Sequence, residues 1–395
     1  MGSALSTFSD FVASTGPSYL TGADQLINEV QKNSYIMRRF LKGADKTFVL
    51  QGGSTIKDAL ILDSASTFQQ YQPNDTFLWQ NPQVVTTLSV DWRFSVDHMS
   101  WTDQEVELNT GGLSNESLRG VYKRLKREKE QRMWTSMING WEDLLWRLPK
   151  STEMESSSGL YPYSIPAFIN EKTNGLYDVT SGGDAFTTVE GINPTTKTLW
   201  KPQRHTYTGG TEWDNPANPQ TNILSAFDKM FYAVKFEAPP TKQEYFENPK
   251  LNSQFIACSR KSLNAYQRLL RASQDRFTGI ANYQDPAYLT PQYGGIDLQY
   301  VASLDTAALY GSAGTTYYAE DSASANYKGP RYYWINGQYL APVFHTSRYM
   351  VSKPPMVHPN QPFTTVAVTD CWWNLVCRSR QRHGIVYPSS DSTGF

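Results

Sequence analysis

Hydrophobic and polar residues alternate most regularly between residues 84 and 96, in the stretch "VVTTLSVDWRFSV". Each second position from Val84 to Val96, including Trp92 and Phe94, is apolar or threonine, and this period of two is typical of a strand with one buried face. The pattern predicts one strand across all these residues, about 43 Å long at the usual rise per residue.

An antiparallel partner for this strand is predicted within residues 47–64, which are also rich in β-prone residues. The segment between the two carries Pro73 and Pro82 and is expected to be a loop. A two-stranded arm of this length is only marginally stable alone in water, so it needs a surface to lie on.

Helical periodicity is strongest in residues 114–148, which we predict to form one helix that Pro149 ends. Its length would be about 50 Å at 1.5 Å per residue. The apolar stripe lapses at residues 126–132, "KREKEQR", and resumes at Met133. Gly140 lies inside this helix, where it is expected to bend the helix.

Shorter elements fill the rest of the chain. Helices are predicted from Thr21 to Gly43 and at residues 223–236 and 260–273; strands are predicted at 253–259, 295–304, 332–345 and 363–379. Residues 150–220 are rich in Gly, Pro, Ser, Thr and Asn and favour loops with short strands. This mixture predicts the α+β class.

Composition limits the kind of protein. The 395 residues carry a net charge of −1, with 18% charged and 13% aromatic residues, which fits a folded and aromatic-rich chain. The apolar runs fall far short of the roughly 18 residues of a membrane helix, so no membrane partner is predicted. Cys258, Cys371 and Cys377 are too few for a disulfide framework and are expected to be buried free thiols.

Charge is distributed unevenly along the chain. Residues 47–113 hold eight acidic and two basic residues, a net charge of −6, whereas residues 114–132 hold seven basic and three acidic residues, a net charge of +4. An acidic arm therefore precedes a basic half-helix. If the arm covers the helix of a neighbouring copy, these charges would set the register of assembly.

No pattern of catalytic chemistry stands out. The sequence lacks P-loop, dinucleotide-binding, nucleophile-elbow and zinc-protease motifs, and its five histidines are scattered. We therefore predict no catalytic residue, no cofactor and no metal site. The aromatic content leaves a glycan-binding or glycan-cleaving protein of a phage tail or surface as an alternative. A DNA-coating protein is disfavoured by the near-neutral charge.

The order of predicted elements resembles a known family. An arm at residues 46–108, a spine-like helix at 114–148, a strand–helix unit at 255–273 and a closing strand group at 363–388 follow one another. This order resembles the major capsid protein of tailed double-stranded-DNA bacteriophages, which has the Hong Kong 97 fold. The resemblance rests on the order of elements and on no invariant motif.

The resemblance implies a structural protein that self-assembles into an icosahedral virion shell, in hexamers and pentamers, within the bacterial cytoplasm. Its implied segments are an N-terminal arm (1–45), an extended β-hairpin loop (46–113), a peripheral domain with the spine helix (114–240), an axial domain (241–345) and return strands to the peripheral domain (346–395). Implied partners are a separate scaffolding protein, portal and decoration proteins, and packaged double-stranded DNA, contacted without sequence specificity.

The charge pattern and the resemblance together select candidate interface residues. One relative cross-links its subunits through a lysine of the extended loop, and Lys57 is the only lysine between Lys46 and Lys123. The predicted subunit-interface residues are Lys57, Asp58, Asp91, Asp97, Lys123, Arg124 and Arg127.

Overall fold

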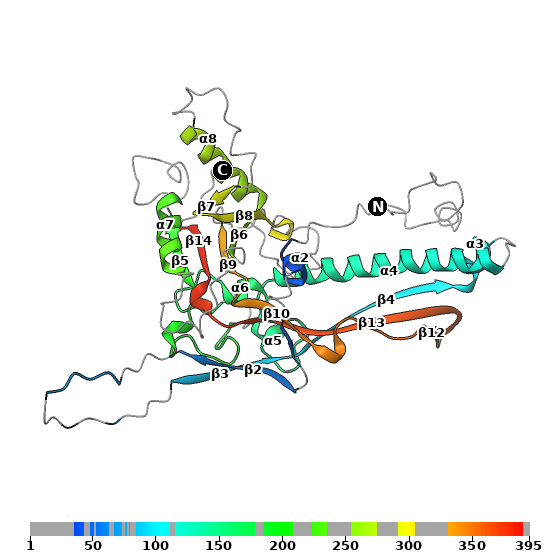
Figure 1. Cartoon of the computed structure of the whole chain (residues 1–395), viewed down its shortest axis with the longest axis horizontal. Helices are drawn as coiled ribbons and strands as arrows, with labels where there is room; N and C mark the ends of the chain where they lie inside the picture. Colours follow the sequence, from blue (N-terminus) through cyan, green and yellow to red (C-terminus); the bar gives the residue numbers. More distant parts are fainter. Residues whose placement is uncertain are drawn as a thin grey trace.

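The structure is a computed structural model (Figure 1). It describes residues 35–42, 48–50, 53–62, 67–72, 76, 79, 84–110, 115–177, 185–207, 223–234, 254–274, 291–304 and 331–389. The predicted helix starting at Thr21 is described only as α2 (Tyr35–Lys42), and its earlier residues lie outside the described ranges.

One six-stranded sheet is built around β13 (Gln361–Cys377), the longest described strand. It pairs antiparallel with β4 (Arg93–Thr102), β10 (Leu340–His345), β11 (Val351–Ser352) and β12 (Met356–His358), and β10 pairs in parallel with β1 (Phe48–Leu50). The spine helix α4 (Asn115–Leu145) lies along β4 and β13, and α3 (Asp103–Thr110) joins β4 to it (Figure 1). The predicted long helix is confirmed.

A second six-stranded sheet has the order β5–β14–β9–β6–β8–β7. Its strands are β5 (Gln203–Tyr207), β6 (Gln254–Cys258), β7 (Gln292–Tyr293), β8 (Ile296–Tyr300), β9 (Tyr332–Asn336) and β14 (Gly384–Pro388). The helices α7 (Ile223–Val234) and α8 (Arg260–Gln274) pack on it and match the predicted helices. Two short helices, α5 (Ser151–Met154) and α6 (Ile165–Phe168), follow α4 along the chain.

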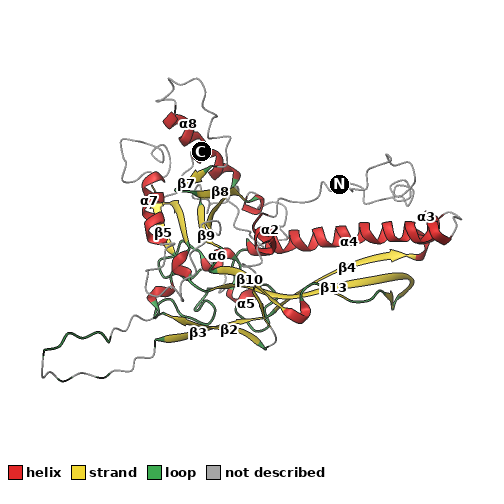
Figure 2. Cartoon of the chain, in the orientation of Figure 1, coloured by secondary structure: helices red, strands yellow, loops and turns green. Residues whose placement is uncertain are grey.

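A separate two-stranded hairpin extends from the body (Figure 2). It consists of β2 (Thr55–Ile61) and β3 (Val85–Asp91), which pair antiparallel from Thr55 opposite Asp91 to Ile61 opposite Val85. The predicted pairing of the two β-prone runs is thus confirmed.

The predicted single strand over residues 84–96 is wrong, because the chain changes sheet at Trp92. Trp92 and Arg93 are both buried, which shifts the inward-facing set by one residue, so Phe94 and Val96 point outward. The Trp92 indole donates a hydrogen bond to the Gly53 carbonyl (3.0 Å). Arg93 donates two hydrogen bonds, to the carbonyl oxygens of Met154, at the end of α5, and of Ser156, just beyond it. These buried polar contacts hold the break in place.

The predicted strand over residues 332–345 also divides, at residues 337–339. Its first half is β9 of the second sheet and its second half is β10 of the first. The sheets also cross the predicted segment boundaries. β5, from the segment 114–240, and β14, from 346–395, both join the sheet formed mainly by strands of 241–345.

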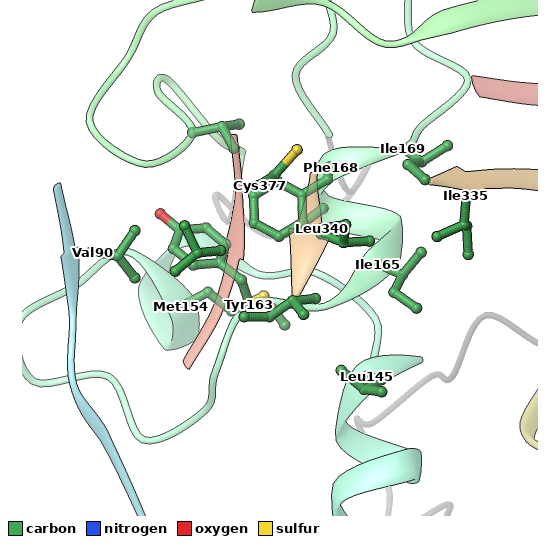
Figure 3. Packing of buried hydrophobic residues seen from close by; sticks show 14 of the residues in the cluster. Val90, Leu145, Met154, Tyr163, Ile165, Phe168, Ile169, Ile335, Leu340 and Cys377 are labelled. Carbon is green, nitrogen blue, oxygen red and sulfur yellow. The ribbon is translucent and has the colours of Figure 1, made fainter. Parts of the chain in front are cut away.

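The main core lies where α4, the first sheet and the inner side of the second sheet meet. Figure 3 shows part of it, with side chains from β3, α4, α6 and β10 converging. The Trp141 ring packs against those of Phe344 and Trp373, each with a centroid distance of 5.7 Å. Cys258, Cys371 and Cys377 are buried free thiols, as predicted.

A fully buried arginine ties the loops between the sheets together. Arg380 lies between β13 and β14 and donates hydrogen bonds of 2.7–3.0 Å to the carbonyl oxygens of Phe168, Gly175 and Trp200. Burial lowers the pKa of Arg380 to about 10, although the neighbouring Glu190 carboxylate favours the charged guanidinium group. Burial also raises the pKa of Glu190 to about 8. The guanidinium group therefore stays charged at neutral pH.

Candidate subunit interface

The outer end of the β2–β3 hairpin exposes apolar side chains. Ile61 and Val85 face each other across the strands and are 72% and 60% exposed, and Trp79, in the connecting segment, is 92% exposed. At the base of the hairpin, Leu88 and Val90 are buried in the main core. The base of this two-stranded ribbon is thus packed into the body. None of the described residues covers its outer end. An exposed apolar ribbon of this kind is expected where another molecule covers the surface.

The first sheet exposes a second apolar surface on its face opposite α4. Met99 and Trp101 of β4 point toward α4 and are buried with Met133, whereas Phe94 and Val96 point away and are 62% and 69% exposed. Met356 of β12 is also exposed on this face, since it pairs with Val366, which pairs with Ser100 of β4. Val357 and Phe363 are exposed too, but they have the parity of Met99 and Trp101 and lie on the other face. Three large apolar side chains in water on one face of a sheet give that face the character of an interface.

The basic half of α4 forms an ion pair with α3 of its own chain. The Lys129 ammonium group lies 3.4 Å from the Glu105 carboxylate of α3. Arg127 is exposed and borders an open hollow of about 340 Å³ along α4, which Trp134 and Ile138 also line. This part of the helix therefore presents both positive charge and apolar surface.

The predicted interface residues lie on four elements, β2, β3, β4 and α4. Lys57 is exposed on β2, and the neighbouring Asp58 forms an ion pair with Arg378 at 2.9 Å. Asp91 ends β3, and its carbonyl oxygen accepts a hydrogen bond from Asn374 (2.7 Å). The remaining predicted residues are half-buried Asp97 on β4, exposed Arg127 on α4, and Lys123 and Arg124, which lie in α4 with side chains outside the described part.

These residues do not converge within one chain. The β2–β3 hairpin and the N-terminal half of α4 extend toward opposite ends of the molecule (Figure 1), so Lys57, Asp58 and Asp91 are remote from Lys123 and Arg127. Asp97 lies on the side of β4 that faces α4, because it shares the parity of buried Met99. A pairing between hairpin acids and helix bases therefore requires a second copy, and it remains a prediction.

Two buried glutamates with raised pKa values lie away from the hollow along α4. Burial raises the pKa of Glu142 and of Glu155 to about 7, and the Met37 amide and the Thr188 hydroxyl respectively donate hydrogen bonds to them. Neither glutamate lines a hollow, and the described residues include no cluster of His, Cys, Asp and Glu that could hold a metal ion. Within the described ranges, no helix is long and apolar enough to span a membrane.

The aromatic residues that motivated the glycan alternative serve mainly as core. Trp141, Trp146, Trp200, Trp334 and Trp373 are fully buried. Rings enclosed in this way cannot stack on a sugar, so the tryptophan content gives that alternative little support.

Comparison with solved structures identifies the architecture. A chain of the cyanophage A-1(L) capsid asymmetric unit aligns with a TM-score of 0.52 and 10% identity, over 96% of both chains. A chain of the native GTA particle capsid aligns with a TM-score of 0.51 and 8% identity, over 95% of this chain and 97% of the other. The chain has the Hong Kong 97-type capsid fold. No family model matches its sequence, and no curated protein sequence is significantly similar to it.

In this capsid fold, the exposed apolar surfaces are the feature that the sequence pattern missed. Phe94 and Val96 continue the alternation of residues 84–92, so the pattern placed them on the buried face with Leu88. The sequence carried little signal for the change, since only Met99 and Trp101, near the end of β4, are apolar at the opposite parity. Only the pairing of β4 with β13 shows which parity is buried.

Proposed function

We propose that this chain is the major capsid protein of a tailed double-stranded-DNA bacteriophage and that it self-assembles into the icosahedral shell enclosing the genome. The observation that carries the proposal is the capsid fold, which aligns over nearly the whole of this chain and of the compared capsid chains. The exposed apolar surfaces of the hairpin and the first sheet support it, because a subunit of a closed shell buries such surfaces against its neighbours.

The proposal gives each part of the chain a role. The N-terminal arm (1–45) ties neighbours together, and the hairpin within 46–113 reaches over an adjacent subunit. The sheet around β13, with α4, forms the peripheral domain, and the second sheet forms the axial domain around five- and six-fold positions. A separate scaffolding protein, a portal, decoration proteins and packaged DNA are the proposed partners. The virion, after assembly in the bacterial cytoplasm, is the proposed location.

Particle formation tests the proposal directly. We expect the purified full chain, alone or with a co-expressed scaffolding protein, to give particles of megadalton mass in light scattering and closed shells in negative-stain microscopy. A stable monomer or small oligomer under all these conditions would contradict the proposal.

A variant of the hairpin tests the surface that supports it. Ile61→Ser combined with Val85→Ser removes two exposed apolar side chains from the ribbon, so it should reduce shell yield without lowering the melting temperature of the subunit. Leu160→Ser is the matched control, since Leu160 is equally exposed but lies on the body. Equal shell yield from the hairpin variant and the control would remove the hairpin from the interface.

Charge reversal tests the proposed pairing between subunits. Changing Lys123, Arg124 and Arg127 to Glu should impair assembly and leave subunit folding intact, because like charges would then oppose the acidic arm of a neighbour. A control with the same change of net charge reverses the exposed Lys172, Lys261 and Lys353. Normal shells from the first triple variant would refute the pairing.

A further inference from the structure

A polar hollow of about 260 Å³ lies at one edge of the second sheet. Arg204, His205 and Thr206 of β5 line it together with Lys229 of α7 and Tyr387 of β14. β5 is the edge strand, and α7 packs against both β5 and β14, so three elements fix the walls. The shell proposal assigns no task to this hollow.

The positive charge of the hollow is positioned by hydrogen bonds. The Arg204 Nη1 donates to the Glu171 carbonyl oxygen (3.2 Å) and to the Tyr387 hydroxyl (3.5 Å). A guanidinium group has five N–H donors, so these two contacts hold it in place and leave donors for a ligand. The Glu171 carboxylate is already bound to Arg331, and no acidic side chain of the described residues lines the hollow.

His205 adds a group whose charge can change. Its Nε2 is buried without a hydrogen-bond partner among the described residues. Burial lowers the pKa of His205, and the nearby Lys229 ammonium group lowers it further. The imidazole is therefore neutral at pH 7. An anion beside Lys229 would offset the repulsion that keeps it so.

We propose that this hollow binds a phosphate group. Two permanent cations, of which Arg204 offers a planar fork of donors and Lys229 a point charge, match the charge and donor requirements of a phosphate dianion. The Thr206 hydroxyl, at the exposed side of the hollow, supplies a further donor. The phosphate can come from the backbone of duplex DNA or from a free phosphate in solution.

The site has a definite pH dependence. The charged groups around His205 are Arg204 on its own strand and Lys229 on α7, with the Glu171–Arg331 pair behind Arg204 and Asp228 directed to the Tyr293 hydroxyl. Cations outnumber acids around His205, and their repulsion disfavours its protonation. A bound anion would offset part of this repulsion, so His205 would protonate more readily in the complex. Anion binding therefore strengthens as pH falls, by up to about tenfold if the bound anion raises the pKa by about one unit.

Binding of sulfate to the full chain tests the site, because sulfate keeps its charge between pH 5.5 and 8 while phosphate does not. We expect saturable binding in equilibrium dialysis, with affinity increasing toward pH 5.5. Arg204→Gln and Lys229→Gln should each weaken it about tenfold or more, as for a lost charge-assisted contact. His205→Gln should remove the pH dependence. Lys353→Gln changes an exposed lysine that directly follows β11 of the first sheet, and it should change nothing.

A second set of titrations distinguishes the sources of phosphate. Inorganic phosphate and a 20-base-pair DNA duplex are titrated against the same variants, with thermal melting to confirm that each variant is folded. A loss of duplex affinity in Lys229→Gln, larger than in Lys353→Gln, identifies DNA as the source, whereas a loss confined to inorganic phosphate identifies the free ion. Sulfate and phosphate binding that is equal in wild type, Arg204→Gln and Lys229→Gln would overturn the proposal, whether or not the chain forms shells.

Discussion

Replacing Arg380 with methionine tests how far one buried cation supports the body of the subunit. The methionine side chain fills similar volume but donates no hydrogen bond. The carbonyl oxygens of Phe168, Gly175 and Trp200 would each lose the hydrogen bonds that the guanidinium group donates to them. Glu190 would also lose the electrostatic attraction of Arg380, which favours its charged form.

The expected cost follows from the number of groups left unpaired. A buried polar group deprived of its partner costs about 1–3 kcal/mol, and breaking a buried charged contact from one side costs about 3–5 kcal/mol. We therefore expect Arg380→Met to lower the free energy of unfolding by about 4 kcal/mol. This is a large part of the roughly 5–15 kcal/mol that keeps a typical protein folded.

Arg378→Met is the matched control, two residues away. Arg378 is 43% exposed and pairs with Asp58 at the surface, so its loss should cost at most about 1 kcal/mol. Urea unfolding of unassembled subunits, followed by tryptophan fluorescence, measures both variants. Equal midpoints for the two variants would refute the reasoning, since burial would then make no difference to an arginine in this segment.

Three further outcomes follow from individual positions. Gly384→Ala should destabilise by about 1–3 kcal/mol, because its Cβ would lie 2.3 Å from the Met230 Sδ and 2.9 Å from the Gln203 carbonyl oxygen, and a thermal melt would show it. Gly140→Ala should instead stabilise α4 by about 1 kcal/mol in the same melt, because its Cβ would meet nothing within 4 Å. Burial raises the pKa of Glu142 to about 7, above its unfolded value of 4.5. Between these two values the folded state binds a proton that the unfolded state releases. The stability that this group contributes is therefore fully present below pH 4.5 and is lost as the pH rises through 7. Urea midpoints at pH 5.5, 6.5 and 7.5 should accordingly fall less steeply in Glu142→Gln than in wild type, and parallel curves would contradict this assignment.

The sequence was sufficient for elements whose signals are local. The long helix, α7 and the β6–α8 unit each carry a clear periodicity and end signals, and the structure has them within a few residues of prediction. The antiparallel pairing of β2 with β3 was also predictable, because two β-prone runs flank a segment with turn residues. The order of these elements was enough to suggest the capsid fold.

Strand partners were not predictable, because they depend on contacts between distant parts of the chain. Nothing near Trp92 in the sequence indicates that the next residues pair with β13, some 270 positions later. Likewise, the short stretch at residues 337–339 does not reveal that β9 and β10 belong to different sheets. The charge pattern identified a candidate pair of surfaces, but the distance between them appears only once the hairpin and α4 are placed.

The two sheets are joined by two short connections that run side by side, β9 to β10 and β13 to β14. The Arg378 amide donates to the Tyr339 carbonyl (2.7 Å), and the Asn336 amide donates to the His383 Nδ1 (3.1 Å), so the connections are bonded to each other. A single strand crossing could act as a hinge, but a bonded pair resists both twisting and separation. In a shell whose curvature differs between five-fold and six-fold surroundings, the body of such a subunit would keep its shape, and the hairpin would take up the difference.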